Sequence, residues 1–377
     1  MNIIATTIAL IACVVLSVQS AVGAQILYLT SSQDKAVIVY SVNGENGELV
    51  EKFKTKLPGR PGVMTFSPDA EYVYVTMSAA GKPGIVTLKR HGDGSLSLSG
   101  TAALTSDSCY LRTDGSGRFL LASHYSAGDV SIYRIVDGVC TSELTQLRKT
   151  APRAHCVEFD PSGRFVFVPH TSPNKVYQFH FDDGDGTISP NDPPFVDGPD
   201  RNHRYHEPRH YVHHPVLDTA YTSGEFGGGI TAWKFDPDSG TLKRLETLST
   251  LQPDVSGEFY AADIQVTPDG RFVYVSNRDQ TADRPAESRQ DTLAAFALDS
   301  ATGLMTRIGW FPTPNQPNSF CVDQTGRYLY SAGTDTSILF AYHIDQKTGH
   351  LDHFATYETG RVPVWVMCGS VDQPPAD

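Results

Sequence analysis

The sequence predicts an all-β chain, a seven-bladed β-propeller with four antiparallel strands in each blade. Three observations lead to this fold: a turn-and-strand motif recurs along the chain, a second apolar run follows each copy, and the C-terminal segment matches a strand that the first unit lacks. The motif is clearest in TPDGRFVYVSNR, residues 267–278, where a Pro/Asp/Gly turn precedes an aromatic residue and alternating β-branched residues. This pattern is typical of a strand that leaves a tight turn.

The copies of this motif are regularly spaced. Counted at the second residue of each copy, they fall at positions 68, 115, 161, 215, 268 and 324, so the steps are 47, 46, 54, 53 and 56 residues. ILYLTSS, which starts at Ile26, resembles the same strand without its turn and makes a seventh unit. A period of this length with several short strands per unit indicates propeller blades.

Each unit carries a second hairpin signal. An apolar run such as DVSIYRI or GITAWKF follows the first hairpin, and in six units a Gly then stands one or two residues before Leu, Ile or Met. Glycine supplies the positive φ that such turns require. The first unit lacks its innermost strand, and VPVWVMC at residues 362–368 supplies a matching one, so we expect the last segment to close the ring and leave no exposed sheet edge.

Length and charge limit the possible functions. The 377 residues could hold two or three average domains, but uniform repeats favour one ring. The formal net charge is −12 and no basic run offsets it, so we expect no nucleic-acid partner. We also expect the protein to act as a monomer.

The N-terminus resembles a signal peptide. Residues 3–18 are apolar, and small residues follow up to Ala24. We therefore divide the chain into a signal peptide at 1–24, a propeller at 25–370 and a disordered tail at 371–377. A retained membrane anchor is the alternative, because no Lys or Arg precedes the apolar run. We favour export to the periplasm or the medium, with no stable membrane insertion after the leader is removed.

Loss of the leader would remove Cys13 and leave five cysteines, so at least one must stay unpaired in a monomer. Four of them, Cys109, Cys156, Cys321 and Cys368, fall on predicted innermost strands. We expect small buried thiols there rather than a disulfide or a catalytic thiol.

Polar side chains recur at matching places in units four to six. They stand five or six residues before the turn or about seven after it, which is the same end of a hairpin. Because the first strand of each blade lines the axis, this end is one mouth of the central channel. The predicted catalytic cluster, in which ionisable groups meet in a concave mouth, consists of His155, Arg209, Glu225 and Arg278, with Asp263 nearby. A structural hydrogen-bond network that fills the channel is the alternative.

We expect further polar groups of this mouth to bind substrate. These are Asp263, His210, Asn277, His124 and His170. The insertion at residues 281–291 lies at the same mouth. We favour a solvated loop without function there, and a rim or lid is the alternative.

A run of histidines raises the question of a metal site, namely His203, His206, His210, His213 and His214. In a strand, His210 and His214 share one face while His213 points to the other. Five close neighbours cannot all bind one ion, so we predict no metal site. No organic cofactor is required by the chemistry considered below.

Several motifs resemble one known family. AHCVEFDPSGRFVFVP, PRHYVHHP followed by GEFGGGITAW, AADIQVTPDGRFVYVSNR and the closing VPVWVM are similar to motifs of the seven-bladed β-propeller lactonases, the 6-phosphogluconolactonase family, which includes the fungal carboxy-muconate cyclases. The resemblance extends over residues 25–369. It implies that His155, Arg209, Glu225 and Arg278, with Asp263 nearby, line the active-site cleft.

Some positions depart from the family pattern. Tyr110 stands where the family usually has His, His124 replaces an Asn, Asn174 replaces an Asp, and Asn318 replaces an Arg in QPNSF. The last change removes one cation from the mouth, which argues against recognition of a phosphorylated sugar.

The resemblance and the cluster together suggest a hydrolase that opens a sugar-acid lactone, with the lactone or the sugar acid as its small-molecule partner. His155, oriented by Glu225 or Asp263, would be the general base, and the two arginines would stabilise the oxyanion. One alternative is a muconate-type cyclase that closes a diacid to a lactone. The other is a noncatalytic exported propeller that binds a partner, because FVYVSNR and YVYVTMS also resemble repeats of surface propellers.

Overall fold

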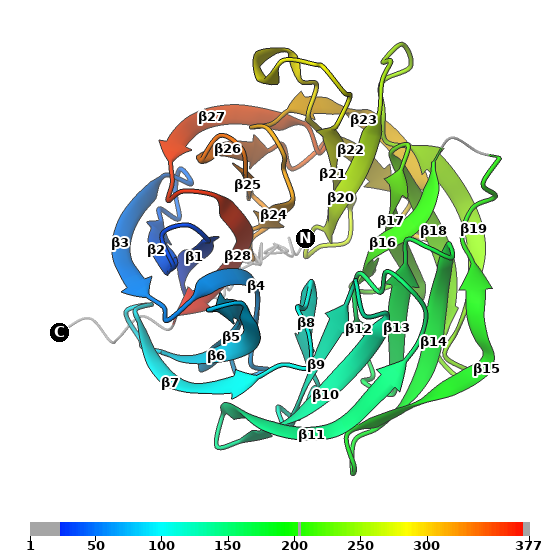
Figure 1. Ribbon diagram of the computed structural model, residues 1–377. Coiled ribbons are helices and arrows are strands. Elements are labelled where there is room, and N and C mark those ends of the chain that lie inside the picture. The colour runs from blue at the N-terminus through cyan, green and yellow to red at the C-terminus, as the bar shows by residue number, and fades with distance from the viewer. Residues whose placement is uncertain (1–22, 203–204, 372–377) are drawn as a thin grey trace, which may run out of the picture.

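The computed structural model describes residues 23–202 and 205–371 and confirms the predicted seven-bladed propeller. Seven four-stranded antiparallel blades surround one central axis, and blades five and six are joined into one eight-stranded sheet (Figure 1). The predicted tail at 371–377 lies outside the described residues except for Val371, which is not part of a tail but ends β28 and pairs with Ala24. The predicted signal peptide also lies outside them except for its last two residues, of which Ala24 begins β1. The predicted single propeller domain therefore accounts for the described chain.

Each blade begins at the axis and runs outward in chain order, except that the last strand of the chain is the innermost strand of blade one. Blade one consists of β28 (Pro363–Val371), β1 (Ala24–Ser31), β2 (Ala36–Val42) and β3 (Leu49–Lys56), and blade two of β4 (Arg60–Phe66), β5 (Tyr72–Ala79), β6 (Lys82–Arg90) and β7 (Leu96–Ala103). Blade three consists of β8 (Tyr110–Thr113), β9 (Phe119–His124), β10 (Asp129–Val136) and β11 (Val139–Lys149), and blade four of β12 (Glu158–Phe159), β13 (Phe165–His170), β14 (Lys175–Asp182) and β15 (Thr187–Asp197). Blade five consists of β16 (His206–His213), β17 (Thr219–Phe226), β18 (Gly229–Asp236) and β19 (Thr241–Ser249), and blade six of β20 (Phe259–Val266), β21 (Phe272–Asp279), β22 (Thr292–Leu298) and β23 (Met305–Pro312). Blade seven consists of β24 (Ser319–Val322), β25 (Tyr328–Gly333), β26 (Ile338–Ile344) and β27 (Leu351–Glu358).

The two ends of the described chain close the ring. β28 pairs antiparallel with β1 along its whole length, from Ala24 opposite Val371 to Ser31 opposite Pro363. This confirms the prediction that VPVWVMC supplies the missing inner strand, and Figure 1 shows the red β28 beside the blue β1. The ladder leaves blade one with the same four strands as its neighbours.

The inner turns are closed by side chains that accept hydrogen bonds from the turn amides. Asp160 accepts from Phe165 N at 2.7 Å and from Ser162 N at 2.8 Å, and Asp114 and Asp323 do the same in blades three and seven. In blade five His214 takes this place, since its Nδ1 accepts from the amides of residues 216 and 217 at 3.1 and 2.9 Å. His214 is therefore engaged in a turn.

Tyrosines in the second strands join successive blades. Tyr221 in blade five donates its hydroxyl to the carbonyl of Gly303 in blade six at 2.7 Å. The same contact, from the tyrosine of one blade to the hairpin glycine of the next, recurs as Tyr28–Gly94, Tyr74–Gly138, Tyr274–Gly349 and Tyr330–Gly47. The motif tyrosine and the hairpin glycine thus meet across the blade interface, where apolar side chains such as the fully buried Trp233 form the core.

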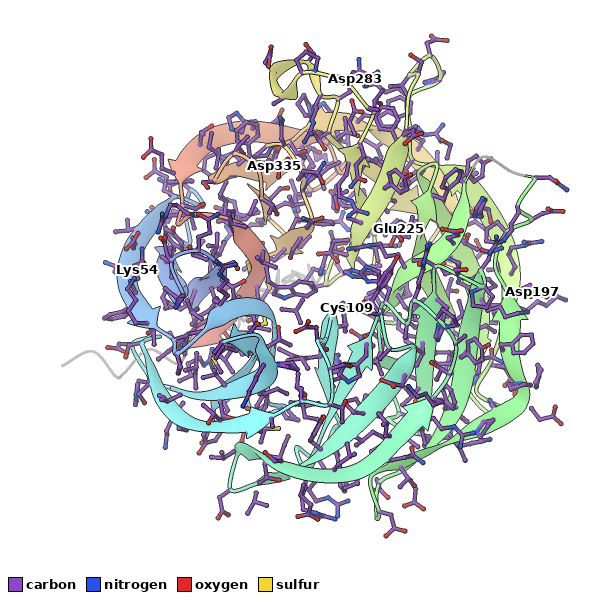
Figure 2. The ribbon with its side chains drawn as sticks, in the orientation of Figure 1. Lys54, Cys109, Asp197, Glu225, Asp283 and Asp335 are labelled. Atoms are coloured by element: carbon purple, nitrogen blue, oxygen red, sulfur yellow. A yellow bond between two sulfur atoms is a disulfide. The ribbon has the colours of Figure 1, made fainter. Side chains whose placement is uncertain are left out.

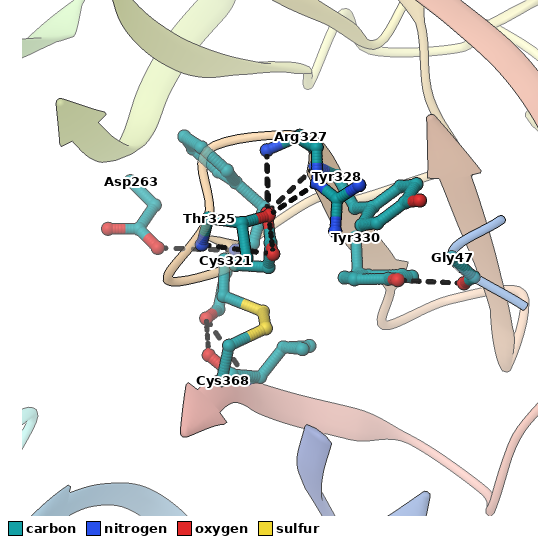
Figure 3. Close-up of a disulfide and its surroundings, with 12 residues drawn as sticks. Gly47, Asp263, Cys321, Thr325, Arg327, Tyr328, Tyr330 and Cys368 are labelled. Atoms are coloured by element: carbon teal, nitrogen blue, oxygen red, sulfur yellow. Dashed lines mark hydrogen bonds between the residues drawn. A yellow bond between two sulfur atoms is a disulfide. The ribbon is translucent and has the colours of Figure 1, made fainter. Parts of the chain in front are cut away.

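A disulfide joins blade seven to the closing strand. Cys321 in β24 and Cys368 in β28 are bonded, with their Cα atoms 6.1 Å apart (Figure 3). The prediction of buried thiols is wrong for these two, because ring closure brings their strands side by side although 47 residues separate them. Cys109, Cys140 and Cys156 are free, and the last two are buried.

We predict that this disulfide stabilises the closed ring. Loop-closure entropy for a separation of 47 residues corresponds to about 4 kcal/mol as an upper value. Reductant should therefore lower the melting temperature of the wild-type protein and leave that of Cys368→Ser unchanged. Thiol titration of the denatured mature protein should find three thiols; five would contradict the bond.

Candidate functional site

The predicted cluster lies at one mouth of the central channel, at the end where the innermost strands begin. Figure 2 shows Glu225 and Cys109 toward the middle of the ring, whereas Lys54 and Asp197 lie at its outer edge. The side chains come from blades four, five and six, which are neighbours. A single residue pair, Phe226 opposite Tyr260, also connects β17 to β20 and joins blades five and six at this mouth.

Irregularities in two inner strands orient three side chains of the candidate site. The ladder between β16 and β17 shifts register between Pro208 and Tyr211, and that between β20 and β21 shifts between Ala261 and Ile264. Arg209, His210 and Asp263 occupy these bulges. Bulges reorient side chains and are frequent next to active sites.

Serines of the second strands hold the bulged backbone. Ser223 accepts a hydrogen bond from His210 N at 3.1 Å and donates to the carbonyl of Ala262 at 2.8 Å. Ser276 accepts from Asp263 N at 3.0 Å. These hydroxyls replace the ladder bonds that the bulges interrupt, so the two bulges keep defined geometries.

Glu225 stands between two guanidinium groups. Its Oε1 accepts from Arg278 Nη2 at 3.1 Å and lies 3.5 Å from Arg209 Nε. Arg278 also donates to the carbonyls of Tyr260 and Ala261 and to Asn318 Oδ1, at 3.2 to 3.3 Å. Burial, followed by the nearby Arg209, lowers the pKa of Arg278 to about 10, so its guanidinium remains charged at neutral pH.

Arg209 also contacts a second acid through His210. Arg209 Nη1 lies 3.1 Å from His210 Nε2, and His210 Nδ1 lies 2.9 Å from Asp263 Oδ1. Because a guanidinium only donates hydrogen bonds, Nε2 must accept, and the proton of the neutral ring belongs to Nδ1. Burial and then Arg209 hold the pKa of His210 well below its ordinary value, in agreement with this tautomer.

His155 has the ring of His210 on one side and that of Tyr125 on the other, each with its centroid at 5.3 Å. Its Nδ1 is buried, and neither ring nitrogen has a hydrogen-bond partner among the described residues. Burial, followed by the charge of Arg209, holds the pKa of His155 well below its usual range. His155 is thus a neutral imidazole with free ring nitrogens beside two cations.

The expected orientation of His155 by Glu225 or Asp263 is not seen in the contacts. Glu225 binds the arginines, and Asp263 accepts from His210 and from the amides of Ile264 and Phe320, at 2.9 and 3.2 Å. Figure 3 shows Asp263 next to the disulfide-bearing segment of blade seven. His155 is instead positioned by packing and by the bond from its own amide to the carbonyl of Pro169 at 3.0 Å.

Two residues expected to bind substrate, Asn277 and His124, have their polar atoms in other contacts, whereas a third, His170, keeps its buried Nε2 without a partner among the described residues. Asn277 is bonded to Thr250 and Thr292. His124 is fully buried between the carbonyl of Asp107 and the hydroxyl of Ser131. His170 is fully buried as well and contacts the carbonyl of Pro152 through Nδ1.

Two aromatic residues beneath the cluster were not assigned a role from the sequence. The ring of Tyr110 makes edge contacts with His210 at 5.1 Å and with Trp365 at 5.6 Å. Trp365 belongs to β28, so the closing strand contributes to the floor of the site. Its place in VPVWVM, which aligns with the inner strands of the other blades, was the available signal.

The histidine run does not form a metal centre in the described chain, where no group of three or more His, Cys, Asp or Glu side chains could hold an ion. His206 stacks on Phe226 at 4.9 Å, and His213 packs beside Phe167 and Tyr211. His203 lies outside the described residues.

In the part of the chain that the structure describes, no helix is long and apolar enough to cross a membrane.

Comparisons with known proteins agree with this architecture. The chain is 29% identical over 359 residues to the 6-phosphogluconolactonase of Pectobacterium carotovorum, which covers 92% of this chain and 99% of that protein. It is 28% identical over 348 residues to the 6-phosphogluconolactonase of Cronobacter sakazakii, with the same coverage. The solved periplasmic gluconolactonase of Pseudomonas aeruginosa has a TM-score of 0.81 at 21% identity and covers 92% of this chain and 99% of its own. Residues 26–368 match the family described as lactonase, 7-bladed beta-propeller, and the chain therefore belongs to that family and is a lactonase.

Proposed function

We propose that this lactonase opens a sugar-acid lactone to the free acid by attack of water on the lactone carbonyl. The observation that carries the proposal is the neutral His155, whose ring nitrogens are free, beside two guanidinium groups held by Glu225. Ester hydrolysis needs a group that takes a proton from water and cations that stabilise the oxyanion. The mouth contains both.

In this mechanism His155 removes a proton from a water molecule as the water oxygen bonds to the carbonyl carbon. The carbonyl oxygen becomes an oxyanion. When it collapses, the bond from the carbonyl carbon to the ring oxygen breaks, and the imidazolium of His155 returns the proton to the leaving alkoxide. The products are one carboxylic acid group and one hydroxyl group, with His155 neutral again.

The two arginines have different roles in this mechanism because they differ in the number of N–H groups that lack a hydrogen-bond partner. Arg278 uses four of its five N–H groups in hydrogen bonds, to Tyr260, Ala261, Asn318 and Glu225. Arg209 makes one such bond, to His210, and its Nη2 has no partner in the described chain. We assign oxyanion stabilisation to Arg209 and a supporting electrostatic role to Arg278, whose position Glu225 maintains.

The first test is proton release by the protein from Gln25 onward on gluconolactone, with and without a 6-phosphate. His155→Ala should lower kcat by about 10²- to 10⁴-fold, because the general base is lost. His91→Ala, a change at an exposed histidine bonded to Ser97 at 2.9 Å, should leave kcat unchanged. Unchanged turnover by His155→Ala would remove this histidine from the mechanism.

The same assays separate the two alternatives. Cyclisation of muconate-type diacids without lactone hydrolysis would identify a cyclase. A protein that acts on neither lactones nor diacids, and whose Arg209→Ala and Arg278→Ala variants still bind its partner, would be a binding module.

We predict that ionisation of Asp263 controls how kcat/KM varies with pH. Burial raises the pKa of Asp263 to about 6, so this carboxyl group is charged above pH 6 and neutral below it. Protonation weakens the bond from His210 Nδ1 and thereby releases Arg209. We therefore expect kcat/KM to fall as the pH falls through about 6, and Asp263→Asn, which keeps an acceptor but cannot ionise, to lose this dependence. The same acid limb in Asp263→Asn would contradict the assignment.

We also propose that the protein is exported. The apolar segment at residues 3–18 and the small residues before Gln25 support cleavage after Ala24, and a disulfide is typical of oxidising compartments. Expressed with its own N-terminus, protein recovered from outside the cytosol should begin at Gln25 by N-terminal sequencing. A membrane-bound form that retains residues 1–24 would support the anchor alternative.

A further inference from the structure

A second pocket opens at the other mouth of the channel, where the inner turns lie. Its volume is about 680 Å³, a size typical of small-molecule sites. The turns of blades two, three and four form its rim, and the polar groups inside include Arg112 in β8 and Glu158 in β12. It lies at the opposite ends of the innermost strands from His155 and Arg209.

Tyr110 lies between the two mouths. Its ring contacts His210 and Trp365 of the lactone site, whereas its hydroxyl donates to Glu158 Oε1 of the second pocket at 2.7 Å. Tyr110 therefore lines this pocket on the side that faces the lactone site, and the polar groups of the pocket take no part in the mechanism proposed above.

Arg112 and Glu158 form an ordered pair with unused hydrogen-bonding capacity. Arg112 Nε lies 3.0 Å from Glu158 Oε2, and the arginine side chain is 48% exposed within the pocket. Its two Nη groups have no partner among the described residues. Each oxygen of Glu158 contacts one partner, so each keeps a free lone pair. The free N–H groups of Arg112 and the free lone pairs of Glu158 are thus adjacent hydrogen-bond donors and acceptors in the same pocket.

The charges of the pocket restrict its ligand. Arg112 and Glu158 compensate each other, while the rim adds the carboxylates of Asp114 and Asp160, which are held by turn amides and serine hydroxyls. An anion would be repelled by these acids and could use only the arginine. A cation would lie against Arg112. Neutral hydroxyl groups, which both donate and accept, suit the pair better.

The apolar walls support the same ligand class. Phe66, Phe159 and Met367 line the pocket and are half-buried, so each presents apolar surface to it. A pyranose ring has an apolar face of C–H groups and an edge of adjacent hydroxyls. The pocket offers a matching apolar wall and a donor–acceptor pair.

We propose that this turn-side pocket binds a neutral pyranose sugar, with vicinal hydroxyls on Arg112 and Glu158 and the ring face against Phe66 or Phe159. The site is distinct from the lactone site and does not depend on the proposed hydrolysis. A ligand of this size in an open pocket is expected to bind with a Kd on the order of 1 mM.

The test is a titration of the protein with methyl glucopyranoside, mannopyranoside, galactopyranoside and xylopyranoside, followed by saturation-transfer NMR. At least one should bind, and Arg112→Gln and Glu158→Gln should each weaken its binding at least tenfold. Arg118→Gln is the matched control, because this exposed arginine of blade three lies outside the pocket and is bonded to Ser116 at 3.0 Å. Melting temperatures of all variants show whether they fold.

A crystal soaked with the bound pyranoside should show the sugar next to Arg112 and Glu158. Failure of all four sugars to bind would overturn the proposal, as would equal binding by folded Arg112→Gln and wild type. Density for the sugar only beside Arg209 and Arg278, or binding of benzoate in preference to the sugars, would also overturn it.

Discussion

The pairing of β28 with β1 is the constraint on which the remaining structure depends. Without it blade one would lack its inner strand, and β1 would expose a row of unpaired backbone groups to the channel. The Cys321–Cys368 bond reinforces the closure from blade seven. Closure also places Trp365 under His210, so the last segment of the chain completes the floor of the candidate site.

The candidate site contains two acids and two arginines whose charges offset each other. One carboxylate, Glu225, lies between Arg209 and Arg278, and a second, Asp263, acts on Arg209 through the neutral His210. These two acids hold cations that would otherwise repel each other. Burial, together with the charge of Arg209, keeps His155 neutral. This low pKa makes His155 a weak base, so the mechanism that we propose relies on oxyanion stabilisation for much of its rate.

The propeller offers two chemically different mouths on one axis. At the mouth where the inner strands begin, the β-bulges of β16 and β20 turn ionisable side chains toward one another. At the mouth formed by the turns, most carboxylates are engaged by turn amides, and the pair Arg112–Glu158 remains available. Tyr110 contacts both, because its ring and its hydroxyl lie at different depths of the channel.

The sequence by itself determined the number of blades, the closing strand and the mouth at which His155, Arg209, Glu225 and Arg278 meet, because repeat spacing and strand periodicity translate directly into position along a hairpin. It could not determine which side chains of that mouth face each other. The bulges at Arg209–His210 and Asp263 break the alternation, and Asn277 and His124 use their polar atoms in contacts with residues up to 27 positions away. Only the tertiary structure decided the partner of Asp263, the Cys321–Cys368 bond and the second pocket, since each depends on contacts between different blades.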